Sequence, residues 1–488
     1  MDTKPVRSRQ DRPRPFRPAA SLLAGIAALS LAGCAALPDR EPAPPLRDAR
    51  GYAADRSFAG DAASWPADSW WSRYGDVQLE ELIGEALAGS PTMATAQARL
   101  RRAQAAAQQA DAAGAPQLAL DASVSSQKQS YNYLTPRAVT PQGMNDYGRV
   151  TLDFSWEFDF WGKNRASLAA ATSEAEAARA DVAQARLVLA AAVASAYAEL
   201  AREYAAMDTA TAALEVRGKT AALFQRRYAN GLETLASVRQ VDAHRASAET
   251  DLLSINEQIA LQRNRIAGLV GAGPDRGLAI ARPSVRLSQS FGLPADLSAD
   301  LVGRRPDIVA ARLRAQAAGH RIDQARAAFY PNVNLVAFAG VQSLGLDALA
   351  RGGSSVASVG PALSLPIFDG GRLRGQLRGA NADRAQAVAS YDGTVIQALQ
   401  DVADAAASQR ALGRELASAG EAVDAAREAW RLQNNRYQGG LSNYLDVLSA
   451  EDTMLGNLRV QSDLQSRSFA LDVALVRALG GGYTAPHP

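Results

Sequence analysis

Long, proline-free and alanine-rich stretches constrain the fold of this chain more than any other feature. After Gly162 the sequence runs to residue 229 without a proline and with a single glycine, Gly218. This composition favours helix, and at 1.5 Å per residue such a helix extends over ~100 Å. A second proline-free and alanine-rich stretch covers residues 371–436. Two rods of that length bury little against each other, so we expect neighbouring subunits to complete the packing.

The sequence also repeats itself after roughly 210 residues. Residues 90–120 match 305–335, FDFWGK matches LPIFDGG, and RRYANGL (226–232) matches NRYQGGL (435–441). Each half has the order helix, two strands, very long helix, sharp turn and returning helix. The period is too long for a solenoid of small repeats. It predicts two structural repeats, 65–280 and 281–482, followed by a short tail at 483–488.

The expected elements have definite bounds. In the first repeat we predict strands at about 115–130 and 147–161, a long helix at 162–229 and a return helix at 232–270. In the second repeat we predict strands at about 331–344 and 354–368, a long helix at 371–436 and a return helix at 441–479.

The four strand segments alternate between apolar and polar residues. In 149–161 every second residue from Val150 to Phe160 is apolar, and the residues between them are polar or charged. Strands of about ten residues with one apolar face suit a membrane β-barrel. A half-buried sheet of a soluble protein shows the same alternation, so the strands alone leave both possibilities open. Four strands are too few for a channel-sized barrel, whereas several subunits together supply enough.

The N-terminal residues have the features of an export signal. Residues 1–17 are basic, and a 15-residue apolar stretch, Ala19–Gly33, precedes Cys34. That stretch is too short to cross a ~30 Å hydrocarbon core, so we predict a signal peptide over 1–33. The sequence LAGC resembles a bacterial lipobox, which implies a covalent lipid on Cys34; the alternative is a buried free cysteine. Residues 34–64 are charged and proline-rich, which predicts an extended, lipid-anchored tether.

Composition excludes several classes of function. The 52 Lys and Arg against 50 Asp and Glu give a net charge of +2, which does not indicate a nucleic-acid partner. One cysteine and three scattered histidines leave no thiolate cluster and no metal site. The chain has no P-loop pattern, and no nucleophile, base and orienting residue occur together. We therefore expect no enzyme, no catalytic residue, no metal and no cofactor besides the lipid on Cys34.

Six motifs, in order, resemble the outer-membrane efflux channel family, the TolC-like lipoproteins of RND-type tripartite pumps (NodT subfamily). They are WWSRYGDVQLEELIGEAL (70–87), WEFDFWGK (156–163), GRRPDI (303–308), FYPNVNL (329–335), LPIFDGG (365–371) and RYQGGLSNYLDVLSAE (436–451). The match runs from Trp65 to about Gly481. It implies an α+β membrane protein in which three protomers, with four strands each, form one 12-stranded outer-membrane β-barrel continuous with a long periplasmic α-helical barrel.

The resemblance places function in the channel and at its periplasmic tip. By alignment with the family's motif, the periplasmic gate positions are Tyr437, Leu445 and Asp446, while Ser449 replaces an aspartate that is frequent in relatives. Gly231 and Gly440 are the turn glycines, since a chain reversal after a helix favours glycine. The candidate latch residues at the tip are Arg227, Tyr228, Glu233, Arg239 and Arg436, together with Tyr437. Less specific roles stay open: Asp446 as a helix-capping residue, and the latch residues as ordinary surface groups.

The implied function is a passive outer-membrane channel of a tripartite efflux pump, which conducts drugs or other small toxic compounds from the periplasm to the exterior. The implied partners are two further copies in a homotrimer, a periplasmic adaptor (membrane fusion protein), an RND-type inner-membrane pump and outer-membrane lipid. Adaptor and pump open the channel at its tip. Two other readings stay open: an exit duct for type I protein secretion or metal-ion efflux, and a soluble coiled-coil scaffold without a pore.

Overall fold

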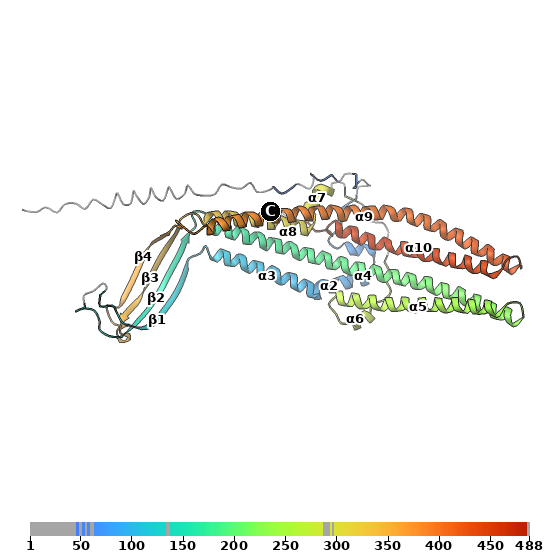
Figure 1. Ribbon diagram of the computed structural model, residues 1–488, viewed down its shortest axis with the longest axis horizontal. Helices are drawn as coiled ribbons and strands as arrows, with labels where there is room; N and C mark the ends of the chain where they lie inside the picture. Colours follow the sequence, from blue (N-terminus) through green and yellow to red (C-terminus); the bar gives the residue numbers. More distant parts are fainter. Residues whose placement is uncertain are drawn as a thin grey trace, which may run out of the picture. The chain divides into compact units, whose positions relative to one another are not determined.

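The computed structural model describes residues 45–47, 51–53, 56–58, 63–132, 137–285, 293–294 and 297–485 (Figure 1). The predicted signal peptide, Cys34 and most of the predicted tether lie outside these residues. The chain divides into two compact units that cut across the two repeats. One contains Gln108–Ala170 and Ala318–Arg384, and the other contains Pro44–Ala107, Ala171–Ala317 and Ala385–Pro488.

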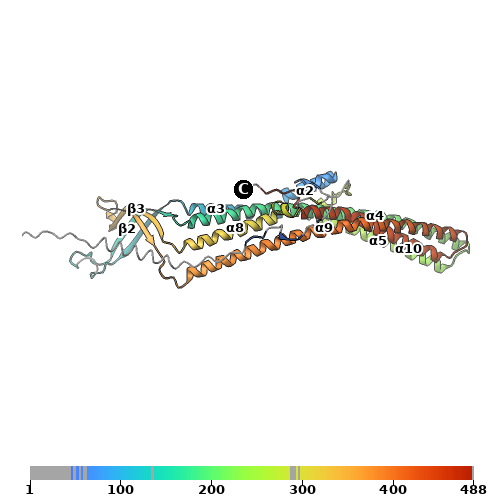
Figure 2. The same ribbon diagram turned by 90° about the horizontal axis from the view of Figure 1, so that it is seen from above.

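The first unit is built around one antiparallel sheet, with the strand order β1-β2-β3-β4 (Figure 1). Its strands are β1 (Gln117–Gln127), β2 (Asn145–Phe158), β3 (Asn332–Leu344) and β4 (Ser355–Ser364). Each repeat contributes the two strands that were predicted, which pair as a hairpin, and β2 pairs with β3 to join the two hairpins (Figure 2). Leu118, Leu120 and Val124 on β1 are all exposed, so none of the described residues covers the apolar face at this edge.

The second strand is shorter than predicted, and the reason is a helix cap. The carboxylate of Asp159 accepts hydrogen bonds from the backbone N–H groups of Asn164 and Arg165, at 3.1 and 2.9 Å. These bonds turn the chain into the first turn of the long helix, so Phe160 lies beyond the strand and is exposed. Asp369 has the same role in the second repeat, where it accepts from Leu373 N–H at 2.8 Å.

The helices follow the predicted order in both repeats. The long helices are α4 (Lys163–Ala229) and α9 (Arg372–Gln438), and the return helices are α5 (Leu235–Leu269) and α10 (Tyr444–Ala478). Before the strands come α2 (Val77–Gly89) and α3 (Pro91–Ala112) in the first repeat, and α7 (Leu297–Arg304) and α8 (Pro306–Ala327) in the second. The short helices are η3 (Trp70–Tyr74), α6 (Asp275–Leu278) and η4 (Leu346–Ala348).

The core of the second unit lies where α2, α4, α9 and α10 meet. It contains Trp70, Tyr74, Leu79, Tyr197 and Leu475, all fully or almost fully buried. The GRRPDI motif belongs to this packing. Arg305 donates to Asp401 Oδ2 on α9 at 3.0 Å and to the backbone oxygen of Ala478 on α10 at 3.2 Å. The motif therefore joins three helices.

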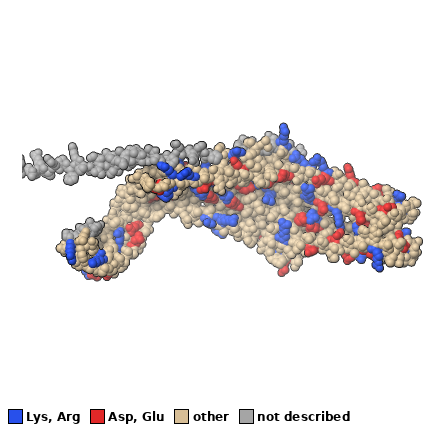
Figure 3. All heavy atoms as spheres, viewed as in Figure 1, with Lys and Arg blue, Asp and Glu red and all other residues tan. Residues whose placement is uncertain are grey.

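The surface of the helices is mixed in charge. On the face seen in Figure 3, basic and acidic side chains are interspersed, with no large area of one sign. None of the helices in the described part of the chain combines the length and the hydrophobicity needed to cross a membrane.

Candidate functional site

Two turns of the same geometry end the long helices. Gly231 follows α4 and Gly440 follows α9, with φ of 71° and 73°. This left-handed conformation is one that residues with a Cβ adopt at a cost. In both turns the next residue closes a Schellman motif. Its N–H donates back at 2.8 Å, from Leu232 to the Arg227 oxygen and from Leu441 to the Arg436 oxygen.

Side-chain caps start both return helices. Thr234 Oγ1 accepts from the N–H of Ser237 at 3.1 Å, and Asn443 Oδ1 accepts from the N–H of Asp446 at 3.0 Å. The capping residue of α10 is thus Asn443, and the carboxylate of Asp446 is exposed in the first turn. A negative charge is favourable at this end of a helix.

Tyr437 connects the two helical hairpins, α4–α5 and α9–α10, next to their turns. Its side chain is 6% exposed, and its hydroxyl donates to Glu233 Oε1 at 2.5 Å. Arg227 lies over the same ring, with its guanidinium carbon 4.9 Å from the ring centre and its Nε 3.8 Å from Glu233 Oε1. Burial and the hydrogen bond to Glu233 raise the pKa of Tyr437, so its hydroxyl remains a donor.

An apolar cluster lies behind this polar contact. Phe224 of α4 packs against Tyr444 of α10 with ring centres 3.8 Å apart, and stacks on Tyr437 at 6.0 Å. Val238 and Val241 of α5 complete the cluster, together with Val447 and Leu448 of α10. All four helices of the two hairpins therefore meet here, while Leu445 is 57% exposed and does not belong to the cluster.

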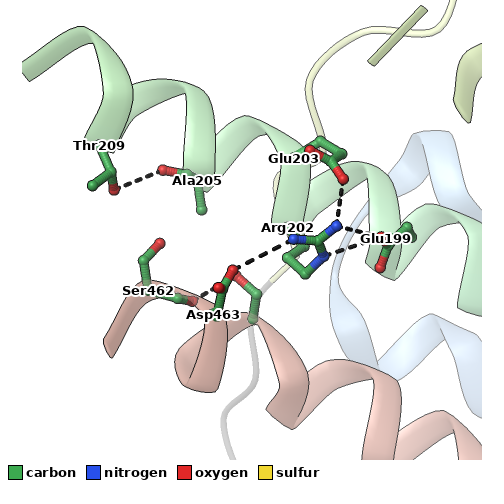
Figure 4. A network of polar contacts seen from close by, with 8 residues as sticks. Glu199, Arg202, Glu203, Ala205, Thr209, Ser462 and Asp463 are labelled. Atoms are coloured by element: carbon green, nitrogen blue, oxygen red, sulfur yellow. Dashed lines mark hydrogen bonds and ion pairs between the residues drawn. The ribbon is translucent and has the colours of Figure 1, made fainter. Parts of the chain in front are cut away.

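Farther from the turns, ion pairs connect the two hairpins. In Figure 4, Arg202 of α4 contacts Glu199 and Glu203 on its own helix and reaches Asp463 of α10 at 3.4 Å. Two more pairs cross the same boundary, Arg217 to Asp452 at 2.6 Å and Arg459 to Asp251 at 2.7 Å. A cavity of about 270 Å³ lies beside Arg202 and Arg459. Partly exposed pairs stabilise by about 0–1 kcal/mol each, so these ion pairs add little to the packing of the apolar cluster.

The structure brings together only some of the residues predicted for the tip. Arg227, Glu233 and Tyr437 are in contact, across the two repeats. Arg239 instead pairs with Asp242 one turn away on α5, at 3.7 Å. Tyr228 is 45% exposed, and Arg436 is exposed.

Sequence reasoning missed the buried half of this site. Phe224 and Tyr444, which join α4 to α10, were not singled out, nor was the buried Glu451. One signal was available: aromatic residues at 224, 437 and 444 fall at the facing ends of two helix pairs. Cys34, the predicted lipidation site, lies outside the described residues.

Comparison with known proteins decides the family. The sequence model described as "Outer membrane efflux protein" matches residues 82–272 and 297–481. The chain belongs to this family. It is 32% identical over 431 residues to the multidrug resistance outer membrane protein MdtP of Escherichia coli K12, covering 87% of this chain and 88% of MdtP. It is 38% identical to the fusaric acid resistance protein FusA of Burkholderia cepacia, covering 72% of this chain and 68% of FusA.

Solved structures agree with the family assignment. The outer membrane protein VceC of Vibrio cholerae is 50% identical, with a TM-score of 0.82 over 86% of this chain and all of VceC. The outer-membrane channel OprN is 28% identical, with a TM-score of 0.81 over 91% of this chain and 98% of OprN. The fold is thus that of the TolC-like channels, a trimeric barrel of strands continuous with a helical barrel. The protein is an outer-membrane efflux channel of a tripartite pump and a transport protein rather than an enzyme.

Proposed function

We propose that the channel is closed by the contact of Tyr437 with Glu233 and Arg227, and that it opens when the α4–α5 and α9–α10 hairpins separate there. The observation that carries this proposal is the 2.5 Å hydrogen bond between the two hairpins beside both turns. In a trimer this contact occurs three times. The ion pairs farther along the boundary are weak enough to part with it.

The strength of the contact suits a gate that needs a partner to open it. A hydrogen bond to a charged group stabilises by about 1.5–3 kcal/mol, so three copies of this bond contribute about 5–9 kcal/mol to closure if they add. A shift from 1% to 99% open needs about 5.5 kcal/mol of differential binding. In this proposal, the binding of a periplasmic adaptor and an RND-type inner-membrane pump to the open form must supply free energy of this size.

Leu445 and Asp446 line the narrow point in this proposal. Both side chains are exposed in the protomer, on the first turn of α10. Around a threefold axis, three Leu445 side chains form an apolar collar, and three Asp446 carboxylates attract cations.

Conductance of the reconstituted trimer tests this assignment. We expect Leu445→Ser and Asp446→Ala to raise the current through the channel and, in cells, to raise sensitivity to vancomycin. Leu432→Ser and Asp424→Ala are matched controls, because both residues are exposed on α9 away from the turns. Currents of the two gate variants that equal those of the controls would reject these residues as the gate.

The lipid on Cys34 is part of the same proposal, with attachment to the outer membrane through residues 34–64. We expect labelled palmitate to enter the wild-type protein and not Cys34→Ser. Assembled Cys34→Ser trimers should still conduct, because the barrel itself is embedded in lipid. Equal labelling of both proteins would contradict lipidation at this cysteine.

The proposed cargo is small toxic organic compounds, which fits the resistance functions in the names of MdtP and FusA. A deletion strain, grown on antibiotics, dyes, bile salts and metals, tests the cargo class. We expect lower resistance to organic compounds, restored by the wild-type gene and dependent on the partner pump. Loss of resistance to metal ions alone would favour a metal-ion efflux duct instead.

A further inference from the structure

A buried carboxyl group lies behind the gate, where the two hairpins meet. Glu451 of α10 is 1% exposed. Its Oε2 is 3.5 Å from the hydroxyl of Thr220 on α4, and its Oε1 has no hydrogen-bond partner of good geometry in the described part of the chain. Carboxyl groups are rarely buried without a cation or several donors. Glu451 therefore needs an explanation that packing alone does not give.

The cation that acts on Glu451 already donates hydrogen bonds to other acceptors. Arg217 of α4 donates through Nη2 to Asp452 at 2.6 Å, and through Nη1 to Nδ1 and the backbone oxygen of His244 on α5, at 2.9 and 3.3 Å. The other groups facing Glu451 are the Trp430 indole of α9 and the Tyr444 phenol of α10. In the part of the chain that the structure describes, the one cation that acts on Glu451 is thus Arg217, which already has other acceptors.

Burial is the largest influence on this carboxyl, and it raises the pKa of Glu451. The charge of Asp452 raises it further, while Arg217, Thr220 and Trp430 lower it. The net effect is a raised pKa of Glu451. This direction agrees with the geometry, because the described residues form no ion pair with this carboxyl group.

We propose that Glu451 is a proton-linked positioning residue of the gate, uncharged when the two hairpins are together and ionised when they separate. Tyr444 connects it to the gate. Tyr444 lies seven residues before Glu451 on the same face of α10, packs on Phe224 of the other hairpin, and immediately precedes Leu445. Hydration of Glu451 requires α10 to move away from α4, which withdraws Tyr444 from Phe224. This inference rests on the proposed opening at the hairpin boundary.

The sign of the pH effect follows from linkage. The closed form binds the proton more tightly than the open form, in which Glu451 faces water with a pKa near its ordinary value of about 4.3. Closure is therefore favoured below that value, and it loses this support as the pH rises through the elevated pKa. In that window the open-to-closed ratio rises by up to tenfold per pH unit for each protomer that opens.

Open probability of the full trimer in planar bilayers, measured from about pH 5 to about pH 8, tests the inference. We expect at least a tenfold increase over this range for wild type. Asp446→Ala, which lacks the exposed carboxylate of the gate, should start from a higher level and still respond to pH. Glu451→Gln should be flat and should stay at the low-pH level, because its amide is neutral in both forms. Glu421→Gln, an exposed position on α9, is the matched control and should follow wild type.

Infrared titration of the assembled trimer gives a second test that needs no change at Glu451. We expect a protonated carboxyl band that disappears above the ordinary glutamate range, and that disappears at lower pH in Tyr437→Phe, whose hairpins part more easily. A pH response of Glu451→Gln equal to that of wild type, or absence of the band, would overturn the role of Glu451. If instead Tyr437→Phe conducts no more than wild type, the proposed latch is wrong. This outcome does not depend on how the open probability changes with pH, so the two proposals can fail separately.

Discussion

Tyr228 and Tyr437 occupy equivalent positions in the two repeats, and the protein uses them differently. Both precede a turn glycine by three residues, so the sequence predicted both as latch residues. In the structure Tyr437 is buried against Glu233 and Arg227, whereas Tyr228 is largely exposed. The two tyrosines differ because different helices pack beside their rings. The contact of Tyr437 with Glu233 joins residues 204 positions apart in the sequence. A local sequence pattern therefore does not predict this contact.

Arg305 gives a prediction at the same scale. It is almost fully buried and joins Asp307, Asp401 and the backbone of Ala478. Arg305→Ala removes the donor that these three acceptors share, while Asp307 and Asp401 keep their bonds to Ile308 and Gln397. We expect a loss of about 1.5–3 kcal/mol, seen as lower heat stability of the trimer. Arg431→Ala, in an exposed pair with Glu428, should leave the stability of the trimer nearly unchanged. Equal effects of the two substitutions would contradict a structural role for the GRRPDI motif.

At the scale of elements, the sequence was most informative where composition alone determines structure. The long helices were predicted to within two residues at both ends, because alanine-rich, proline-free sequence can form little else and a glycine marks each turn. The strand bounds were less accurate. Alternation continues through Phe160, but the cap made by Asp159 ends β2 at Phe158. The alternation of apolar and polar residues does not show at which residue the strand ends and the cap of the next helix begins.

Replacement of glycine by alanine should change stability in opposite directions at a turn and within a helix. A Cβ at Gly231 meets no atom within 4 Å, so the cost of Gly231→Ala comes from backbone conformation alone, about 1–2 kcal/mol. Gly218 lies within α4, also in open space, so Gly218→Ala should stabilise by about 1 kcal/mol. Hydrogen exchange of the tip measures both: faster for Gly231→Ala, and slower or unchanged for Gly218→Ala. Slower exchange at the tip in Gly231→Ala would contradict the left-handed turn.

For the whole molecule, the sheet explains why one chain is insufficient. Among the described residues, the four strands leave two unpaired edges, and the apolar face of β1 is exposed. The sequence left open whether these strands face lipid or a soluble core, because both environments give the same alternation. The family and the solved relatives resolved the question.

Adjacent residues on β1 test which face meets lipid. Leu120 is 71% exposed on the apolar face, and Asp121 lies on the other face. Leu120→Arg should cost about 2–4 kcal/mol per protomer if it lies near the middle of the bilayer, and should reduce assembled trimer in the outer membrane. Asp121→Arg places the same side chain on the polar face and should assemble normally. Normal assembly of both variants would argue against lipid contact at Leu120.

The most direct test of the account is a double-mutant cycle on the latch, read as conductance of the reconstituted trimer. The variants are Tyr437→Phe, Glu233→Gln and the two combined. Because the hydroxyl of Tyr437 donates to the carboxylate of Glu233, each single variant should raise conductance, and the combination should raise it no further than the stronger single variant. Wild-type conductance in all three variants, or effects that simply add, would contradict closure by this contact.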